Sequence, residues 1–180
     1  MNNLELRMYG LVPFNISPIQ QAIQFGHGVV EYGLENFHST TYLDWAKYWK
    51  TFIILNGGTT NTSEMTPGSL NNNLKTLKEN GITLSTFNEP DLGDQLTAIV
   101  FLVDERVFNK KYLDFPAWLM ANHDELVYSY MLNFEYSNSL IKIAEHAKTE
   151  KAEIYEQWIS YIGGEKNAFL RDFLKNFKLA

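Results

Sequence analysis

Residues 51–55 read Thr-Phe-Ile-Ile-Leu, an uninterrupted apolar run of the length of a β-strand. A second run, residues 96–103, reads Leu-Thr-Ala-Ile-Val-Phe-Leu-Val. Strands that lack the usual alternation of apolar and polar residues are typical of sheets that helices cover on both faces. The two runs therefore favour an α/β fold.

The segments around these runs complete the order β-α-α-β-α-β-β. Strands are predicted at residues 4–14 and 82–87, and helices at 19–34, 40–49 and 70–80. We expect right-handed β-α-β crossovers and an antiparallel final pair of strands, because the link between them is short. The prediction is a small three-layer α/β/α sandwich with a four-stranded mixed sheet.

Ser17-Pro18, a capping residue followed by proline, predicts the start of the first helix. Three glycines, Gly26, Gly28 and Gly33, lie inside this helix and each weakens it relative to alanine. We expect them to permit close packing on the sheet. The helix also carries apolar residues at helical spacing, namely Ile19, Ala22, Ile23, Val29, Val30 and Leu34.

The character of the chain changes after Val107. Residues 1–107 are predicted to form the α/β domain and residues 108–180 a helical extension packed on it, with helices near residues 116–120, 154–162 and 168–177 and a less regular segment at 132–148. The terminal helices are rich in large apolar residues. Packing on the parent domain explains these residues, and so does homo-oligomerisation through the C-terminal helices. They are Tyr155, Trp158, Ile159, Phe169, Leu170, Phe173, Leu174 and Phe177.

Composition restricts the chemistry that the chain can perform. The 180 residues are 45% hydrophobic and 20% charged, as in globular proteins, and include no cysteine. Disulfides, thiolate catalysis and cysteine zinc sites are therefore excluded. No signal peptide and no membrane-spanning run is visible, which predicts a soluble, cytoplasmic protein with no membrane partner. The net charge of −6 weakens any case for tight binding to a nucleic-acid backbone, although a local basic patch could act against it.

Two segments are expected to meet beyond the carboxyl ends of the strands, where ligands bind in open α/β sheets. Residues 15–27 include the helix start at Ser17, whose free amides could hold an anion, and Gln20, Gln24 and His27 on neighbouring turns. A lone histidine on a helix is more often a hydrogen-bonded structural residue.

The other segment, residues 87–97, contains the carboxylates Glu89, Asp91 and Asp94 in a turn with proline and glycine. Paired carboxylates can perform general acid–base chemistry, and solvated surface residues of a turn would look the same. Their spacing matches no calcium loop, and the chain has no phosphate-binding loop, dinucleotide fingerprint or HExxH motif. Neither a metal nor a cofactor is predicted.

These residues resemble the archaeal and eukaryotic type of peptidyl-tRNA hydrolase, over about residues 5–105. The resemblance rests on the Gln-x-x-His spacing of Gln24 and His27, on the run Thr-Ala-Ile that starts at Thr97, and on the turn Glu-Pro-Asp-Leu-Gly at residues 89–93. Bacterial and phage proteins of unknown role look similar in that turn and in the tail, which suggests a divergent member with a helical extension.

The resemblance implies hydrolysis of the ester between a peptidyl or aminoacyl group and the 3′ end of tRNA, without a cofactor. The residues it implies for catalysis are Gln20, His27, Glu89, Asp91 and Thr97, and those for ligand binding are Ser17, Gln20, Gln24 and Asp94. Gln20 stands where the family has a lysine, so a positive charge is missing.

That departure leaves an alternative open. The fold could bind a nucleotide or a small phosphorylated ligand without catalysis, as a phage protein that sequesters a host signalling nucleotide would do. Glutamines, acidic residues and abundant aromatic residues suit base recognition and stacking.

Overall fold

The computed structural model describes residues 4–60, 67–132 and 139–180, and the chain divides into two compact units. The first unit comprises residues 1–105 together with residues 169–180, and the second comprises residues 106–168. The first boundary, after residue 105, lies close to the predicted boundary after residue 107. The division differs from the prediction in that residues 169–180, at the end of the chain, belong with the α/β unit. Part of the segment 132–148, expected to be irregular, lies outside the described residues.

The first unit is built on a four-stranded mixed sheet with the order β2-β1-β4-β3. Its strands are β1 (Leu6–Pro13), β2 (Thr51–Gly58), β3 (Leu84–Glu89) and β4 (Gln95–Asp104). β1 is parallel to β2, whereas the pairs β1–β4 and β3–β4 are antiparallel. The predicted order of elements, the mixed sheet and the antiparallel final pair are confirmed.

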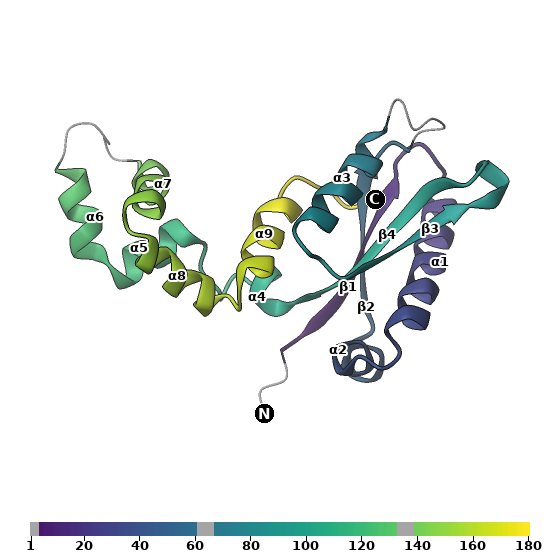
Figure 1. Ribbon diagram of the computed structural model, residues 1–180, viewed down its shortest axis with the longest axis horizontal. Helices are drawn as coiled ribbons and strands as arrows, with labels where there is room; N and C mark the ends of the chain where they lie inside the picture. The colour runs from purple at the N-terminus through teal and green to yellow at the C-terminus, as the bar shows by residue number, and fades with distance from the viewer. Residues whose placement is uncertain (1–3, 61–66, 133–138) are drawn as a thin grey trace. The chain divides into compact units, whose positions relative to one another are not determined.

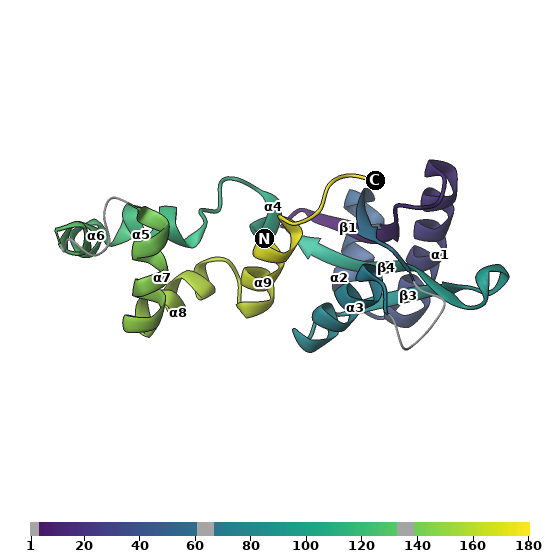
Figure 2. The same ribbon diagram turned by 90° about the horizontal axis from the view of Figure 1, so that it is seen from above.

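Helices cover both faces of this sheet, as Figures 1 and 2 show. Helix α1 (Pro18–Asn36) packs on one face, where a Cβ added at Gly28 would lie 2.6 Å from a methyl group of Val100. Helix α3 (Ser69–Glu79) packs on the opposite face through Leu70, which is fully buried. The three-layer arrangement follows from the unbroken apolar strands, which need cover on both sides.

Gly10 in β1 shows how closely α1 approaches the sheet. The ring of Phe25 lies over this glycine, and an added Cβ would lie 2.1 Å from a ring carbon. Of the three glycines in α1, Gly28 serves the close packing expected of it. Gly33 instead faces the hydroxyl of Tyr42, and Gly26 has no atom within 4 Å of an added Cβ.

Helix α1 begins where predicted and presents an unexpected face to the sheet. Its buried residues are Gln21, Gln24, Phe25, Gly28 and Tyr32. Most of the apolar residues at helical spacing point away from the sheet instead, and Ile19 is 75% exposed, whereas Val29 is partly buried and packs against the core beneath the helix.

The segment after α1 forms two short helical turns in place of one helix. Residues Thr40–Asp44 are α-helical (α2), and residues Trp45–Trp49 form a π-helical turn (η1). The turn places the indole of Trp45 in the core, 5.5 Å from the ring of Phe52 in β2. Lys50 then adopts the left-handed conformation (φ 52°), which ends the turn and lets β2 begin.

The end of the chain lies along the free edge of β2 (Figure 1). The amide of Asn56 donates to the carbonyl of Lys178 at 2.9 Å, and the amide of Ala180 donates to the carbonyl of Ile54 at 3.0 Å. Edge strands need such cover, because their unpaired backbone groups otherwise remain open to other chains.

The second unit is helical, as expected for an extension. Within the described residues, the helices that lie in it or reach into it are α4 (Glu105–Phe108), α5 (Phe115–Asn122), α6 (Asp124–Met131), α7 (Leu140–Glu150), α8 (Ala152–Tyr161) and α9 (Glu165–Leu174). Its core includes Trp118, Leu119, Ile143 and Ile162. Packing within the chain thus accounts for Trp158 and Ile159, which are buried there. None of the helices in the described ranges is long and apolar enough to cross a membrane.

Candidate functional site

A small pocket lies between the start of α1 and the turn that joins β3 to β4. It has a volume of about 160 Å³ and is lined by Ile16, Gln20, Gln24, Glu89, Asp91 and Leu92. A cavity of about 150 Å³ accepts a molecule the size of benzene. The pocket can therefore receive one ring, or a small ester with a water molecule, and would enclose only such a part of a nucleotide.

A chain of hydrogen bonds supports the wall of this pocket, where Gln24 and Glu89 belong to the lining and Thr97 lies behind it, outside the lining. The buried hydroxyl of Thr97 donates to Oε1 of Gln24 at 2.6 Å, and Nε2 of Gln24 donates to Oε2 of Glu89 at 2.5 Å. The Gln24 side chain is 6% exposed and Thr97 is fully buried. Because both ends of the amide are engaged, its orientation is fixed, and it in turn fixes the Glu89 carboxylate at the pocket.

The position of Thr97 depends on an irregularity in the sheet. In the β3–β4 pairing, Phe87 lies opposite Ala98 and Asn88 lies opposite Leu96, so Thr97 has no partner residue. Such a bulge redirects a side chain that regular alternation would send to the other face. Here it lets Thr97 reach α1, although Ala98 also faces that helix.

Gln20 has a structural role that explains its identity. Its Oε1 accepts from the backbone amide and from the hydroxyl of Ser17, both at 3.2 Å, while the Ser17 hydroxyl accepts from the Gln20 amide at 3.3 Å. This reciprocal arrangement is a capping box, for which glutamine at the third helical position is well suited and lysine is not. Gln20 still lines the pocket.

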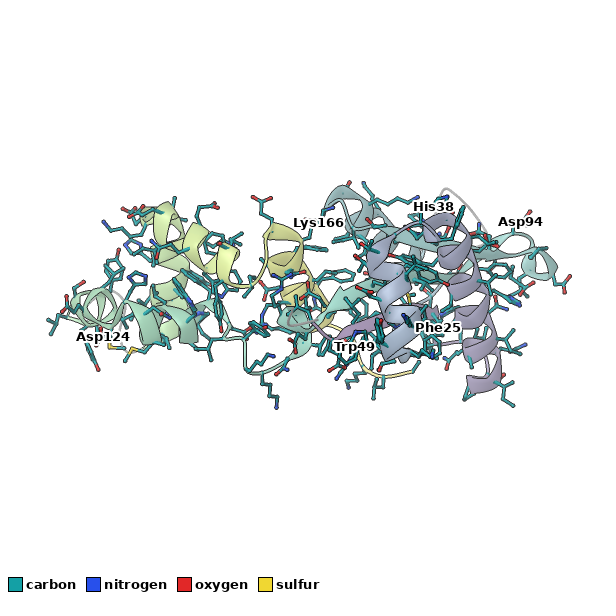
Figure 3. The ribbon with its side chains drawn as sticks, turned by 90° about the horizontal axis from the view of Figure 1, so that it is seen from below. Phe25, His38, Trp49, Asp94, Asp124 and Lys166 are labelled. Carbon is teal, nitrogen blue, oxygen red and sulfur yellow. The ribbon has the colours of Figure 1, made fainter. Side chains whose placement is uncertain are left out.

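The other predicted site residues lie at different places. Asp91 lines the pocket from the 3₁₀ turn η2 (Pro90–Leu92), whereas Ser17 is engaged in the cap. His27 does not line the pocket, and its ring lies 4.4 Å from that of Phe87. Asp94 adopts the left-handed conformation (φ 58°) and points outward from the tip of the hairpin (Figure 3). Neither His27 nor Asp94 is therefore placed to act in the pocket.

The chemistry of the lining favours some ligands over others. Two of its side chains are carboxylates and two are amides, and none is basic. Carboxylate oxygens accept hydrogen bonds from hydroxyl, amino or ammonium groups, and they repel phosphate. The backbone amide of Gln20 at the helix start already donates to the hydroxyl of Ser17, which reduces the capacity of this helix end to hold an anion.

Ile16 and Leu92 also line the pocket and were not predicted as site residues. The only signal in the sequence was their position, since each is an apolar residue inside one of the two polar segments expected to meet. A further buried amide, Gln21, donates to the carbonyl of Pro13 at 3.1 Å and ties α1 to the end of β1. Its role is to position the helix.

The chain matches no known protein family, and no curated protein shows significant similarity to it. Within the described ranges, no group of three or more histidine, aspartate or glutamate side chains could hold a metal ion. The pocket itself is therefore the basis for a functional proposal.

Proposed function

We propose that this pocket hydrolyses the ester that joins an acyl group to the ribose at the 3′ end of tRNA. One observation carries the proposal: Gln24, Glu89 and Thr97, which the sequence resemblance associates with peptidyl-tRNA hydrolases, form one hydrogen-bonded chain at a pocket. Gln24 is 65 residues from Glu89 and 73 residues from Thr97 in the sequence, and the fold brings it to both.

The carboxylate of Glu89 supplies the reactive group in this proposal. Oε2 is held by Gln24, which leaves Oε1 able to orient a water molecule and accept its proton as the water attacks the ester carbonyl. The proton then passes to the ribose oxygen as the ester C–O bond breaks, which yields a free acid and a free hydroxyl. In this proposal the side-chain amide of Gln20, which lines the pocket, donates a hydrogen bond to the developing oxyanion.

Asp91 completes the acidic side of the pocket. It is exposed at the turn and offers acceptors to a second donor on the substrate, such as the neighbouring ribose hydroxyl or the amino group of an aminoacyl ester. We expect Asp91 to affect substrate binding more than the chemical step.

A second candidate is a protein that binds a nucleotide-like ligand without catalysis. The observation that favours it is the engagement of Gln20 in the capping box at a pocket with no basic lining, which leaves oxyanion stabilisation weak. Such a protein could sequester a signalling nucleotide. Its ligand would be recognised through hydroxyl and amino groups, because phosphate does not suit the two carboxylates.

Turnover of defined peptidyl-tRNA and aminoacyl-tRNA distinguishes the two candidates. We expect hydrolysis by the wild type, a fall of about 10²–10⁴-fold for Glu89→Gln, and a rise in KM for Asp91→Asn. The matched control is Glu79→Gln, which removes an exposed carboxylate on α3.

Different results would refute catalysis and favour the binding protein. Equal rates for Glu89→Gln and Glu79→Gln would refute a catalytic role for the pocket. Absence of turnover, together with binding of an adenine nucleoside that Glu89→Gln weakens and Glu79→Gln does not, would favour the binding protein.

A further inference from the structure

The outward face of α1 is apolar along its whole length. Ile19 is 75% exposed, Ile23 48%, Val30 61%, Leu34 65% and Phe37, directly after the helix, 56%. At 100° per residue these side chains fall within one narrow arc of the helix, opposite the face that packs on the sheet. A contiguous apolar stripe of this kind marks an interaction surface.

No charge interrupts this stripe. The only charged residues of α1 are Glu31 and Glu35, and both project from other sides of the helix. Glu35 accepts a hydrogen bond from the hydroxyl of Ser85 on β3, and Glu31 lies on the flank. Because the stripe has no charge of its own, a charged partner would gain nothing from it, whereas a second apolar stripe would fit.

Gly26 lies midway along the length of the stripe, at one edge of it, where no contact within the chain requires a glycine. No atom lies within 4 Å of an added Cβ, and the residue is exposed. Glycine weakens a helix, so a neighbour that requires close approach is its best explanation. A second helix that packs across this point would supply that neighbour.

We infer that two copies of the chain pair through α1, antiparallel about a twofold axis that passes between Gly26 and His27. Positions equidistant from that axis meet across it, so Ile23 of one copy faces Val30 of the other, and Ile19 faces Leu34. The pattern is self-complementary, as a twofold interface requires. This inference does not rest on the proposed function, because the interface does not use Gln24 or Glu89.

The area is sufficient for a modest dimer. The five side chains offer about 350 Å² of apolar surface per copy, when roughly 90 Å² for an aliphatic and about 200 Å² for an aromatic side chain are each multiplied by the exposed fraction of the residue. Since interfaces are roughly 60% apolar, this corresponds to about 600 Å² per copy and about 1,200 Å² in total. That total lies at the lower end of specific interfaces, where weak association is typical, and we therefore expect a dissociation constant of about micromolar order.

Sedimentation velocity over about 1–500 μM, which brackets that range, tests the inference on the full chain. We expect a monomer–dimer equilibrium for the wild type. Val30→Glu and Ile23→Lys should each weaken it at least 100-fold, because a charge would be buried in the apolar seam. An equimolar mixture of the two variants should recover dimers, because Glu at position 30 of one copy meets Lys at position 23 of the other.

The control is Ile141→Lys on α7, which is also an exposed apolar residue at 64% exposure and lies in the other unit. It should leave the equilibrium unchanged, and circular dichroism should show that every variant is folded. A wild type that stays monomeric up to the highest concentration overturns the inference. So does a dimer that Ile141→Lys weakens and Val30→Glu does not, which would place the interface on the C-terminal helices.

Discussion

Replacing Gln24 with glutamate tests the geometry of the candidate site more sharply than its removal would. The two side chains have the same shape, so the variant keeps the bond from Thr97 and places a carboxylate oxygen where Nε2 now lies, 2.5 Å from Oε2 of Glu89. Two carboxylates at that distance cannot both be ionised without a large repulsion. They must share a proton, and the pair therefore retains one proton well above the ordinary pKa of a glutamate.

The size of the effect follows from this contact. Repulsion between unit charges is about 4 kcal/mol at 4 Å for an effective dielectric constant of about 20. Glu89 is partly exposed, so we expect a smaller increase, about two pKa units, which corresponds to about 2.7 kcal/mol. Between about pH 4.3 and about pH 6.3 the folded variant holds a proton that the unfolded chain releases, so its free energy of unfolding falls as pH rises.

Urea unfolding of the wild type and Gln24→Glu at a series of pH values from about 4 to about 8 measures this difference. The swap variant, Gln24→Glu with Glu89→Gln, is the control, because it restores one carboxylate and one amide with the donor and acceptor reversed. Its stability should follow the pH dependence of the wild type. If Gln24→Glu alone also follows the wild type over this range, the two side chains are not in contact and the site as described is wrong.

Three further changes test the fold around the site. Gly28→Ala should lower the free energy of unfolding by about 1–3 kcal/mol, because its Cβ would lie 2.6 Å from Val100. Gly26→Ala should instead leave the monomer up to about 1 kcal/mol more stable, because no atom lies within 4 Å of its Cβ. Urea unfolding compares the two variants, and equal effects would contradict the packing of α1. Burial raises the pKa of Tyr32 to about 12, so above pH 10 the folded chain keeps a proton that the unfolded chain loses, and stability falls by about 1.4 kcal/mol per pH unit. Tyr32→Phe should remove that part of the decline between pH 10 and 12, and an unchanged slope would show that the phenol is not buried. Deletion of residues 178–180 should lower the free energy of unfolding by about 1–3 kcal/mol. It should also speed hydrogen exchange at the amide of Asn56, which donates to the carbonyl of Lys178 in the intact chain. Unaltered exchange would show that the tail does not cover β2.

The strands and their order along the chain could be predicted from the sequence because their signal is local. Unbroken apolar runs at residues 51–55 and 96–103 require cover on both faces, and Ser17-Pro18 sets the start of α1 whatever it packs against. The convergence of Gln20, Gln24, Glu89 and Asp91 at one pocket was also predictable, because topology sends both segments to the same end of the sheet.

Other features depend on partners that lie far away in the chain. Gln21 and Gln24 face the sheet because Pro13, Thr97 and Glu89 satisfy their amides, so a polar face of α1 is buried and an apolar face is left outside. Periodicity alone cannot show this, since it assigns apolar residues to the interior.

The placement of the tail on β2 could not be predicted for a different reason. Its contacts to β2 are backbone hydrogen bonds at Ile54 and Asn56, which any sequence can make. The exclusion of His27 from the pocket depends on the exact phase of α1, because the residue is one turn beyond Gln24 and its ring packs on Phe87 instead.

The rate of peptidyl-tRNA hydrolysis by Glu89→Gln, measured beside the wild type at saturating substrate, tests the central claim most directly. The substitution removes one negative charge and keeps the side chain's shape, so binding should change little and the chemical step should slow. We predict a kcat at least about 100-fold below that of the wild type. A kcat equal to that of the wild type would contradict the assignment of Glu89 as the residue that activates water.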